Sequence, residues 1–222
     1  SFKCNLASLL KIEIFSDVVC PWCFIGKRRL DWVLENSDLG EIELEWKPYQ
    51  LYPNLPAGGV ARAEFLRARY GESADGSRTP ERIRIEAEEV GIAFDYGSID
   101  RVPNTLLAHR LLAMAGETGY QHELAETLFQ AYFCDGLDIG VVDTLVDCAA
   151  TIGMNSETVK EVLDSDAGVD ATLSDIAGAF DAGVVGVPCY RLGGAFLLPG
   201  AQTPDVMIQF IDRAKKRLLE TE

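Results

Sequence analysis

The sequence predicts an α/β protein in which a strand–helix–strand unit opens the chain and a strand–strand–helix unit closes it. Polar and apolar residues alternate near both ends, as in half-buried strands. Between about residues 53 and 183 the apolar period changes to that of helices. With 222 residues, 48% of them hydrophobic, the chain is long enough to bury a core.

The opening unit contains two predicted strands, at residues 11–15 and 41–47, and both alternate polar with apolar residues. A helix is expected to begin between them near Pro21, because a missing N–H costs nothing in the first turn of a helix. Its apolar stripe follows steps that are mostly of three and four, which predicts one buried face. The stripe consists of Cys23, Gly26, Leu30, Val33 and Leu34.

The middle of the chain is predicted to be entirely helical, with no strand inside it. Gly, Pro, Asn and Asp separate the helical candidates. These candidates cover about residues 60–70, 80–90, 104–117, 121–133, 142–152, 157–164 and 169–182.

The closing unit begins with a predicted strand at 184–192 and continues with a partner strand at 195–198. Gly193-Gly194 suits a hairpin turn with positive φ. A last helix is expected from Thr203-Pro204, with the threonine as its cap, to about residue 219. The order βαβ, then ββα, is the thioredoxin topology. We therefore predict a thioredoxin-like domain formed by 11–52 and 184–222 and an inserted helical domain at 53–183.

The stretch Cys20-Pro21-Trp22-Cys23 lies where the first strand meets the helix, which predicts a redox-active dithiol. Cys20 falls at the positive end of the helix, where free N–H groups and the dipole stabilise a thiolate, so we expect it to be the accessible, attacking thiol. Cys23 continues the buried stripe and is expected to be the shielded resolving thiol with the higher pKa. Pro21 and Trp22 are predicted to stiffen the turn and to form an apolar, substrate-binding mouth.

The cysteine pair allows two other interpretations. A zinc site usually needs four ligands and a second spaced pair, and Cys134, Cys148, Cys189, His109 and His122 show no such spacing, so no metal is predicted. Two core cysteines brought together by chance are the other reading. Cys134 and Cys148 are read as core residues.

Three segments resemble the FrnE-like branch of the DsbA family of the thioredoxin superfamily: residues 15–26, residues 104–111, and Gly186-Val187-Pro188 together with residues 199–202. The resemblance implies a DsbA-like thioredoxin fold with a helical insertion, a dithiol–disulfide oxidoreductase or isomerase, and no prosthetic group. It also implies that Pro188 is a cis-proline facing the dithiol. Val187 would then offer backbone hydrogen bonds to a substrate chain.

Several residues near these motifs have two possible roles. Cys189, after the expected cis-proline, is either a small buried strand residue, as free cysteines usually are, or a third redox thiol. His109 either lies over the site or is a satisfied structural histidine, and its apolar helix favours the latter. The basic run Lys27-Arg28-Arg29 reads as a solvated face with a minor effect on Cys20.

The leading functional hypothesis is disulfide exchange with protein substrates or small thiols, with glutathione allowed as a thiol co-substrate. The alternative is a glutathione-dependent isomerase or transferase resembling the kappa-class and 2-hydroxychromene-2-carboxylate isomerase proteins. Those typically use a single Ser or Cys, and tend to show Gly-Ser-Asp where this chain has Gly200-Ala201-Gln202. A third class is a binding module without catalysis, which an intact cysteine pair disfavours.

Composition sets expectations about partners and compartment. A total of 20 Lys and Arg against 35 Asp and Glu gives a net charge of −15, which repels phosphate backbones, so no nucleic-acid partner is expected. No apolar run is long enough to span a membrane. Only two of the six cysteines are close in sequence, and no secretory signal is visible, so a cytoplasmic location is expected. A start at Ser1 leaves a removed leader, and hence the periplasm, open.

Overall fold

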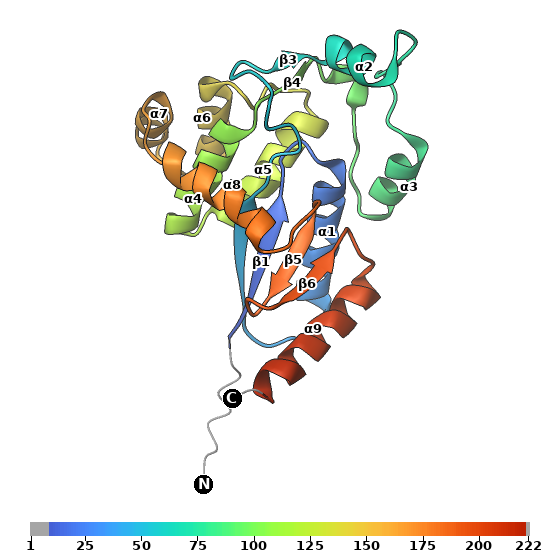
Figure 1. The fold of residues 1–222 in the computed structure, drawn as a ribbon, viewed down its shortest axis with the longest axis vertical. Helices are drawn as coiled ribbons and strands as arrows, with labels where there is room; N and C mark the ends of the chain where they lie inside the picture. The colour runs from blue at the N-terminus through green and yellow to red at the C-terminus, as the bar shows by residue number, and fades with distance from the viewer. Residues whose placement is uncertain (1–8, 221–222) are drawn as a thin grey trace.

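The computed structural model describes residues 9–220, and Cys4 and the N-terminal segment read for a leader lie outside this range. Six strands and nine helices follow one another in this part of the chain (Figure 1). The strands are β1 (Leu10–Ser16), β2 (Ile42–Pro48), β3 (Val60–Ala61), β4 (Arg101–Val102), β5 (Cys189–Leu192) and β6 (Phe196–Pro199). The helices are α1 (Pro21–Asn36), α2 (Arg62–Tyr70), α3 (Glu81–Glu89), α4 (Leu106–Thr118), α5 (Gln121–Phe133), α6 (Val142–Thr151), α7 (Ser156–Asp164), α8 (Val169–Asp181) and α9 (Pro204–Leu219), with a 3-10 turn at Tyr96–Ser98.

The main sheet has the order β2-β1-β5-β6 and joins the two ends of the chain. β1 and β2 are parallel, as a βαβ unit requires, while β5 is antiparallel to β1 and to β6. The hairpin between β5 and β6 turns at Gly193 and Gly194, whose φ angles of 57° and 72° confirm the predicted turn. This is the thioredoxin arrangement that the sequence predicts.

Different helices pack against the two faces of the sheet. Alternation along β1 turns Ile12 toward α1 and α9, where it joins a buried group with Leu30 and Met207. Phe15 points to the opposite face and packs with Ala179 of α8. Helices α4, α5 and α8 contact β2, so the inserted helices cover its side of the sheet (Figure 1).

The closing strand is shorter than predicted. β5 begins at Cys189, and residues 184–188 are irregular. Pro188 has no N–H to donate to the neighbouring strand, which explains why the ladder starts after it. Two further details differ from the prediction. The Thr203 side chain makes no capping hydrogen bond to α9, and the short pair β3–β4 interrupts the segment expected to be purely helical.

The inserted segment and the sheet share one hydrophobic core. A single cluster of buried residues runs from Ile14 of β1 through Phe24 of α1 to Phe129 of α5. The rings of Phe24 and Phe129 are stacked with centroids 5.1 Å apart. The division into domains at 11–52 with 184–222 and at 53–183 therefore stays a prediction, because packing runs continuously across it.

The basic run of α1 is not the solvated face that the sequence suggested. Lys27 and Arg29 are 4% and 5% exposed. Arg29 pairs with Glu86 of α3, and Lys27 pairs with Glu126 of α5 at 3.0 Å. Helices α3 and α5 cover this face of α1, so the charges are buried and must be paired.

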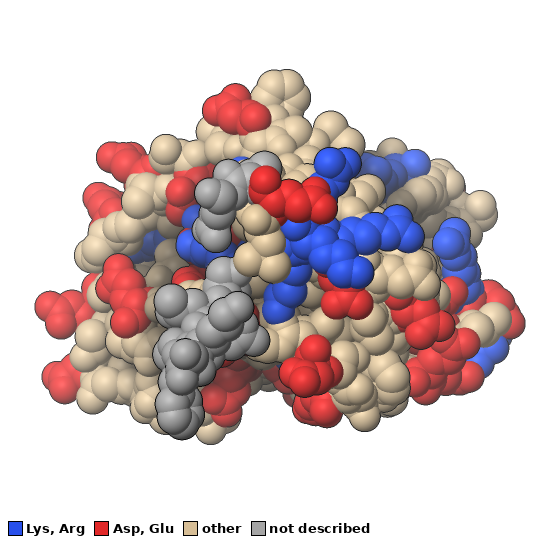
Figure 2. Space-filling view, turned by 90° about the horizontal axis from the view of Figure 1, so that it is seen from below, with Lys and Arg blue, Asp and Glu red and all other residues tan. Residues whose placement is uncertain are grey.

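The surface is acidic but uneven. Figure 2 shows the end of the molecule near the two termini, where acidic side chains spread around the rim and basic ones gather in one band near the middle. Within residues 9–220, no helix is long and apolar enough to cross a membrane.

We expect Arg29→Ala to lower the free energy of unfolding by about 2 kcal/mol, because the Ala201 carbonyl loses a charge-assisted hydrogen bond and the half-buried Glu86 loses its cation. Urea unfolding followed by circular dichroism measures this. Arg84→Ala is the matched control, since Arg84 forms exposed ion pairs with Glu81 and Glu88 and its loss should leave the unfolding midpoint unchanged. Equal effects of the two substitutions would contradict a structural role for the buried pair.

Candidate active site

Cys20 and Cys23 lie at the start of α1, at the carboxyl end of β1. Cys20 is the residue before the helix, with extended backbone angles (φ −97°, ψ 112°), and Pro21 occupies the first turn. The Cys20 carbonyl accepts a hydrogen bond from the Cys23 N–H at 3.1 Å, which closes the turn between the thiols. Cys23 is 1% exposed, as the apolar stripe predicts, but Cys20 is also only 4% exposed, whereas the sequence suggested an accessible thiol.

The cover over Cys20 comes from the distant end of the chain. The Cys20 Sγ lies 3.7 Å from the Val187 carbonyl oxygen, a contact across 167 positions. The Val187–Pro188 peptide bond is cis. The Pro188 carbonyl accepts a hydrogen bond from the Gly200 N–H at 2.8 Å, which ties this loop to the segment before α9.

The environment of Cys23 favours its protonated form. Burial raises the pKa of the Cys23 thiol well above its ordinary value, and the hydrogen bond and electrostatic interaction with Cys20 raise it further. The Ser16 hydroxyl and the Asp17 backbone N–H act in the opposite direction and lower the pKa of Cys23. Ser16 thus contributes to the site, although the sequence analysis did not single it out within the segment 15–26.

A buried hydrogen-bonded pair fixes the loop between β1 and Cys20. Asp17 is 1% exposed and His109 of α4 is 3% exposed. The His109 Nε2 lies 3.1 Å from the Asp17 Oδ1 and 2.9 Å from the Tyr49 carbonyl oxygen. Both neighbours are acceptors, so Nε2 carries the hydrogen. The Asp17 Oδ2 accepts from the Leu51 N–H at 2.9 Å. His109 is therefore a satisfied structural residue that also holds the active-site loop.

A close approach of α1 to β5 brings the dithiol and the cis-proline loop together. Gly26 faces Tyr190 and Pro188, and a Cβ at this position would overlap the Tyr190 Oη and lie 3.3 Å from the Pro188 Cγ. Tyr190 is 3% exposed, and its hydroxyl has no hydrogen-bond partner among the described residues. Only glycine at position 26 permits this distance.

The other three cysteines that the structure describes are free thiols outside the Cys20–Cys23 turn. Cys189 is 3% exposed and packs with Phe15 and Ala179 on the face of the sheet opposite α1, which supports the reading as a buried strand residue. Cys134 is half-buried and Cys148 is buried. Burial raises the pKa of both thiols to about 11.

Pro21 and Trp22 have different surroundings. Pro21 lines a cavity of about 470 Å³, while Trp22 is half-buried with the Arg82 guanidinium 5.2 Å from its ring centroid. The sequence placed both at one apolar mouth. The arginine over Trp22 was not expected, because α3 is distant in sequence.

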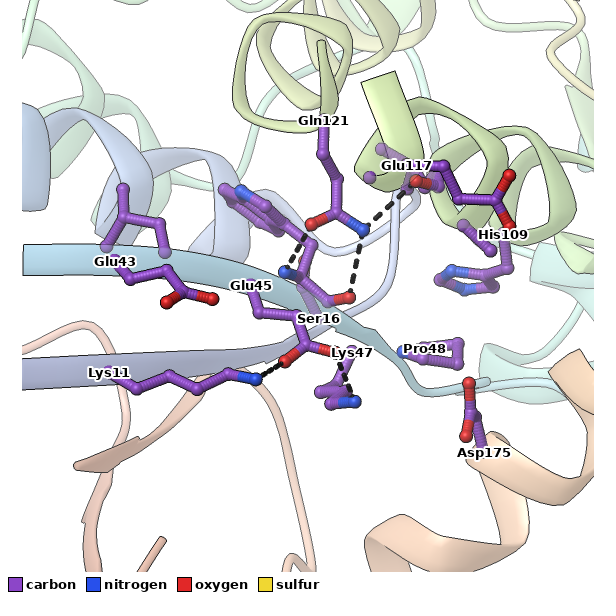
Figure 3. A pocket seen from close by; sticks show the side chains of 15 residues that line it. Lys11, Ser16, Glu43, Glu45, Lys47, Pro48, His109, Glu117, Gln121 and Asp175 are labelled. Atoms are coloured by element: carbon purple, nitrogen blue, oxygen red, sulfur yellow. Dashed lines mark hydrogen bonds and ion pairs between the residues drawn. The ribbon is translucent and has the colours of Figure 1, made fainter. Parts of the chain in front are cut away.

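A second cavity, of about 370 Å³, lies between β2, α4 and α8 and reaches Ser16 and His109 (Figure 3). It is a charged space, in which Lys11 and Lys47 both pair with Glu45. No group of three or more His, Cys, Asp or Glu side chains among residues 9–220 is arranged to hold a metal ion.

Comparison with known proteins places the chain in a family. The model of the DSBA-like thioredoxin domain matches residues 11–212, and the chain belongs to this family. The family supports a thiol–disulfide oxidoreductase in general, which agrees with a dithiol at the start of α1 facing a cis-proline loop.

Individual relatives agree with the family match. The uncharacterised protein YwbO of Bacillus subtilis is 27% identical over 207 residues, which cover 93% of this chain and 98% of YwbO. The crystal structure of a probable DsbA oxidoreductase, SCO1869 from Streptomyces coelicolor, is 28% identical, with a TM-score of 0.79 and coverage of 92% and 89% of the two chains. A 2-hydroxychromene-2-carboxylate isomerase is similar in fold alone, at 13% identity, a TM-score of 0.65 and coverage of 96% and 99%.

We expect the second step of exchange, in which Cys23 attacks a mixed disulfide on Cys20, to accelerate with pH. Because the pKa of Cys23 lies above its ordinary value, the thiol is protonated near pH 7, and its thiolate fraction rises about tenfold per pH unit. The rate should therefore climb through the neutral range without a plateau. Stopped-flow release of a small thiol from Cys20 measures it.

Ser16→Ala removes a hydrogen bond that lowers the pKa of Cys23, so the pKa should rise and the release at pH 7 should slow by roughly fivefold. Ser165→Ala, which removes a hydroxyl from the end of α7, is the control and should leave the rate unchanged. An unchanged pH profile in Ser16→Ala would show that the hydroxyl does not act on the thiol.

Gly26→Ala should displace Tyr190 and Pro188 and destabilise the protein by about 1–3 kcal/mol, as overpacking does. Formation of a mixed disulfide on Cys20 should slow at the same time, because the Val187 loop moves with Pro188. The double variant Gly26→Ala/Tyr190→Phe lacks the overlapping oxygen and should regain most of the stability. Urea unfolding tests this, and failure of the double variant to recover would refute the stated clash.

Proposed function

We propose that the protein exchanges disulfides with protein substrates through Cys20 and Cys23, as a dithiol–disulfide oxidoreductase or isomerase of the FrnE-like type. The observation that carries the proposal is the 3.7 Å approach of the Cys20 Sγ to the Val187 carbonyl at a cis-proline, with Cys23 one helical turn behind. In this proposal the nucleophile Cys20, the resolving thiol Cys23 and the Val187 backbone that meets the substrate lie close together.

The two thiols have separate tasks in this proposal. The Cys20 thiolate attacks one sulfur of the substrate disulfide, forms a mixed disulfide, and releases the other sulfur as a thiolate. Cys23 loses its proton, attacks the Cys20 sulfur and releases the second substrate thiol. The protein dithiol is oxidised by two electrons and the substrate disulfide is reduced to two thiols; in the reverse direction the substrate is oxidised.

The surroundings supply substrate contacts. The Val187 backbone beside the cis-proline offers hydrogen bonds to an extended substrate chain, and Pro21 and Trp22 offer apolar surface. Because Cys20 is buried, a substrate must pass Val187, Pro21 and Trp22 to reach its sulfur. These three residues therefore determine which substrates react. No prosthetic group takes part, and glutathione serves as a thiol co-substrate. A cytoplasmic location and the absence of nucleic-acid and membrane partners belong to the same proposal.

A glutathione-dependent isomerase is the second candidate, favoured by the fold likeness to 2-hydroxychromene-2-carboxylate isomerase. Such an enzyme needs one Ser or Cys to serve bound glutathione, so a second thiol adjoining Cys20 has no task in it. The pair Cys20 and Cys23 therefore favours disulfide exchange.

The test is the reduction of a protein disulfide and the reactivation of a scrambled protein by single variants. Cys20→Ser should lower both activities by more than about a hundredfold, because the nucleophile is lost. Cys23→Ser should accumulate a mixed disulfide on Cys20 that mass spectrometry detects.

Cys134→Ser is the matched control, since this half-buried cysteine caps the C-terminal end of α5 and its loss should leave activity intact. Retained exchange in Cys20→Ser would sink the proposal. Activity that survives in Cys23→Ser and depends on glutathione would point to the second candidate.

A further inference from the structure

The cavity of about 470 Å³ beside Cys20 is built largely by the inserted segment. Val19 and Pro21, the two residues that flank Cys20, form one end of it. Its volume lies within the roughly 300–1,000 Å³ of small-molecule sites. Six aromatic side chains line it: Tyr52, Phe65, Tyr70, Tyr96, Tyr132 and Phe133. Such walls suit a flat ring.

A half-buried arginine lines the same cavity and lacks a carboxylate partner. The Arg62 Nη1 donates to the Gly76 and Tyr96 carbonyls at 2.7 Å and 3.1 Å, which fixes the guanidinium. The guanidinium carbon also lies over the Tyr96 ring, 5.4 Å from its centroid. Within residues 9–220 nothing accepts from its Nε or Nη2, and no carboxylate forms an ion pair with it. The Nε and Nη2 edge is the fork that binds a carboxylate with two hydrogen bonds.

Among the charged residues that line the cavity, Arg62 is the half-buried cation. Asp75 and Arg78 are exposed, and the Asp75 carboxylate accepts from the Ser77 N–H. Burial raises the pKa of Tyr96 and of Tyr132, so these phenols are neutral at pH 7. A cation held among neutral aromatic groups favours an anionic ligand.

The second cavity differs in this respect. Its two lysines, Lys11 and Lys47, share Glu45, and further carboxylates from Glu43, Glu117 and Asp175 line it (Figure 3). It has no cation left for an anionic ligand, unlike the cavity beside Cys20.

We propose that the cavity beside Cys20 binds a small disulfide that carries an aromatic ring and a carboxylate, with the ring between the tyrosines and the carboxylate on Arg62. The proposal rests on disulfide exchange at Cys20 and names a substrate class for it. The Cys20 thiolate attacks one sulfur of the bound disulfide, a mixed disulfide forms, and the other sulfur leaves as a thiolate. Attack by Cys23 on the Cys20 sulfur then releases the second thiol and leaves the protein dithiol oxidised.

Three reagents separate the features of the ligand. They are 5,5′-dithiobis(2-nitrobenzoate), which has rings and carboxylates, 4,4′-dithiodipyridine, which has rings alone, and 3,3′-dithiodipropionate, which has carboxylates alone. Each is reacted with the Cys23→Ser protein, and the thiol release absent from Cys20→Ser/Cys23→Ser is assigned to Cys20. Each reagent is compared only with itself between variants, because the three differ in intrinsic reactivity.

In the same background, Arg62→Gln should slow the reaction of 5,5′-dithiobis(2-nitrobenzoate) by about tenfold, the effect of one charge-assisted contact. Its effect on 4,4′-dithiodipyridine should stay within about twofold, since that reagent has no carboxylate for the fork to bind. Arg62→Lys keeps the charge and should restore part of the rate.

Arg67→Gln removes an equal charge from the exposed side of α2, outside the cavity, and is the control. A loss of the same size in Arg67→Gln would mean general surface electrostatics and overturn the proposal, as would equal slowing of all three reagents by Arg62→Gln. If Arg62→Gln slows 5,5′-dithiobis(2-nitrobenzoate) and 3,3′-dithiodipropionate equally, the ring plays no role in binding. That result would overturn the part of the proposal that concerns the aromatic ring. If no reagent reacts with Cys20 in the Cys23→Ser protein with Arg62 unchanged, the proposed disulfide exchange itself is refuted.

Discussion

The contact between α1 and β5 at Gly26 is the constraint on which the site depends. It sets the distance between a helix from the first 36 residues and a loop from the last 40, so that the Cys20 sulfur meets the Val187 carbonyl. A larger residue at 26 would press on Tyr190 and Pro188 and so separate the cysteines from the loop. The thioredoxin sheet makes the contact available, because β1 and β5 are neighbours in it.

The inserted segment is a second source of order in the active site. His109 on α4 holds Asp17, three residues before Cys20, and Glu86 on α3 holds Arg29 on α1. The insertion also forms most of the cavity next to Pro21. The thioredoxin part supplies the thiols, and the insertion supplies much of what surrounds them, so the chemistry and its selectivity arise from different parts of the chain.

Much of this was visible in the sequence, because it depends on local patterns. The alternation of 41–47, the stripe through Cys23 and Leu30, and the Gly193-Gly194 turn each follow from the period or torsion of a single element. What could not be read were pairings across long separations. Lys27 and Arg29 resemble any exposed basic run until α3 and α5 cover them, and the cover over Cys20 comes from residue 187. Asp17 gave one signal in the sequence, since it is the one charged residue among the five that precede Cys20.

The shared core around Phe24 and Phe129 has a consequence for motion. Domains joined by polar, modest interfaces normally hinge, whereas a continuous apolar interior reinforced by buried ion pairs resists separation. The insertion and the sheet should therefore move as one body, and ligands would enter by rotation of side chains on a nanosecond scale, with no slow closure of a lid. Such a protein binds its partners at a preformed site, and the thiol–disulfide exchange step would limit its turnover.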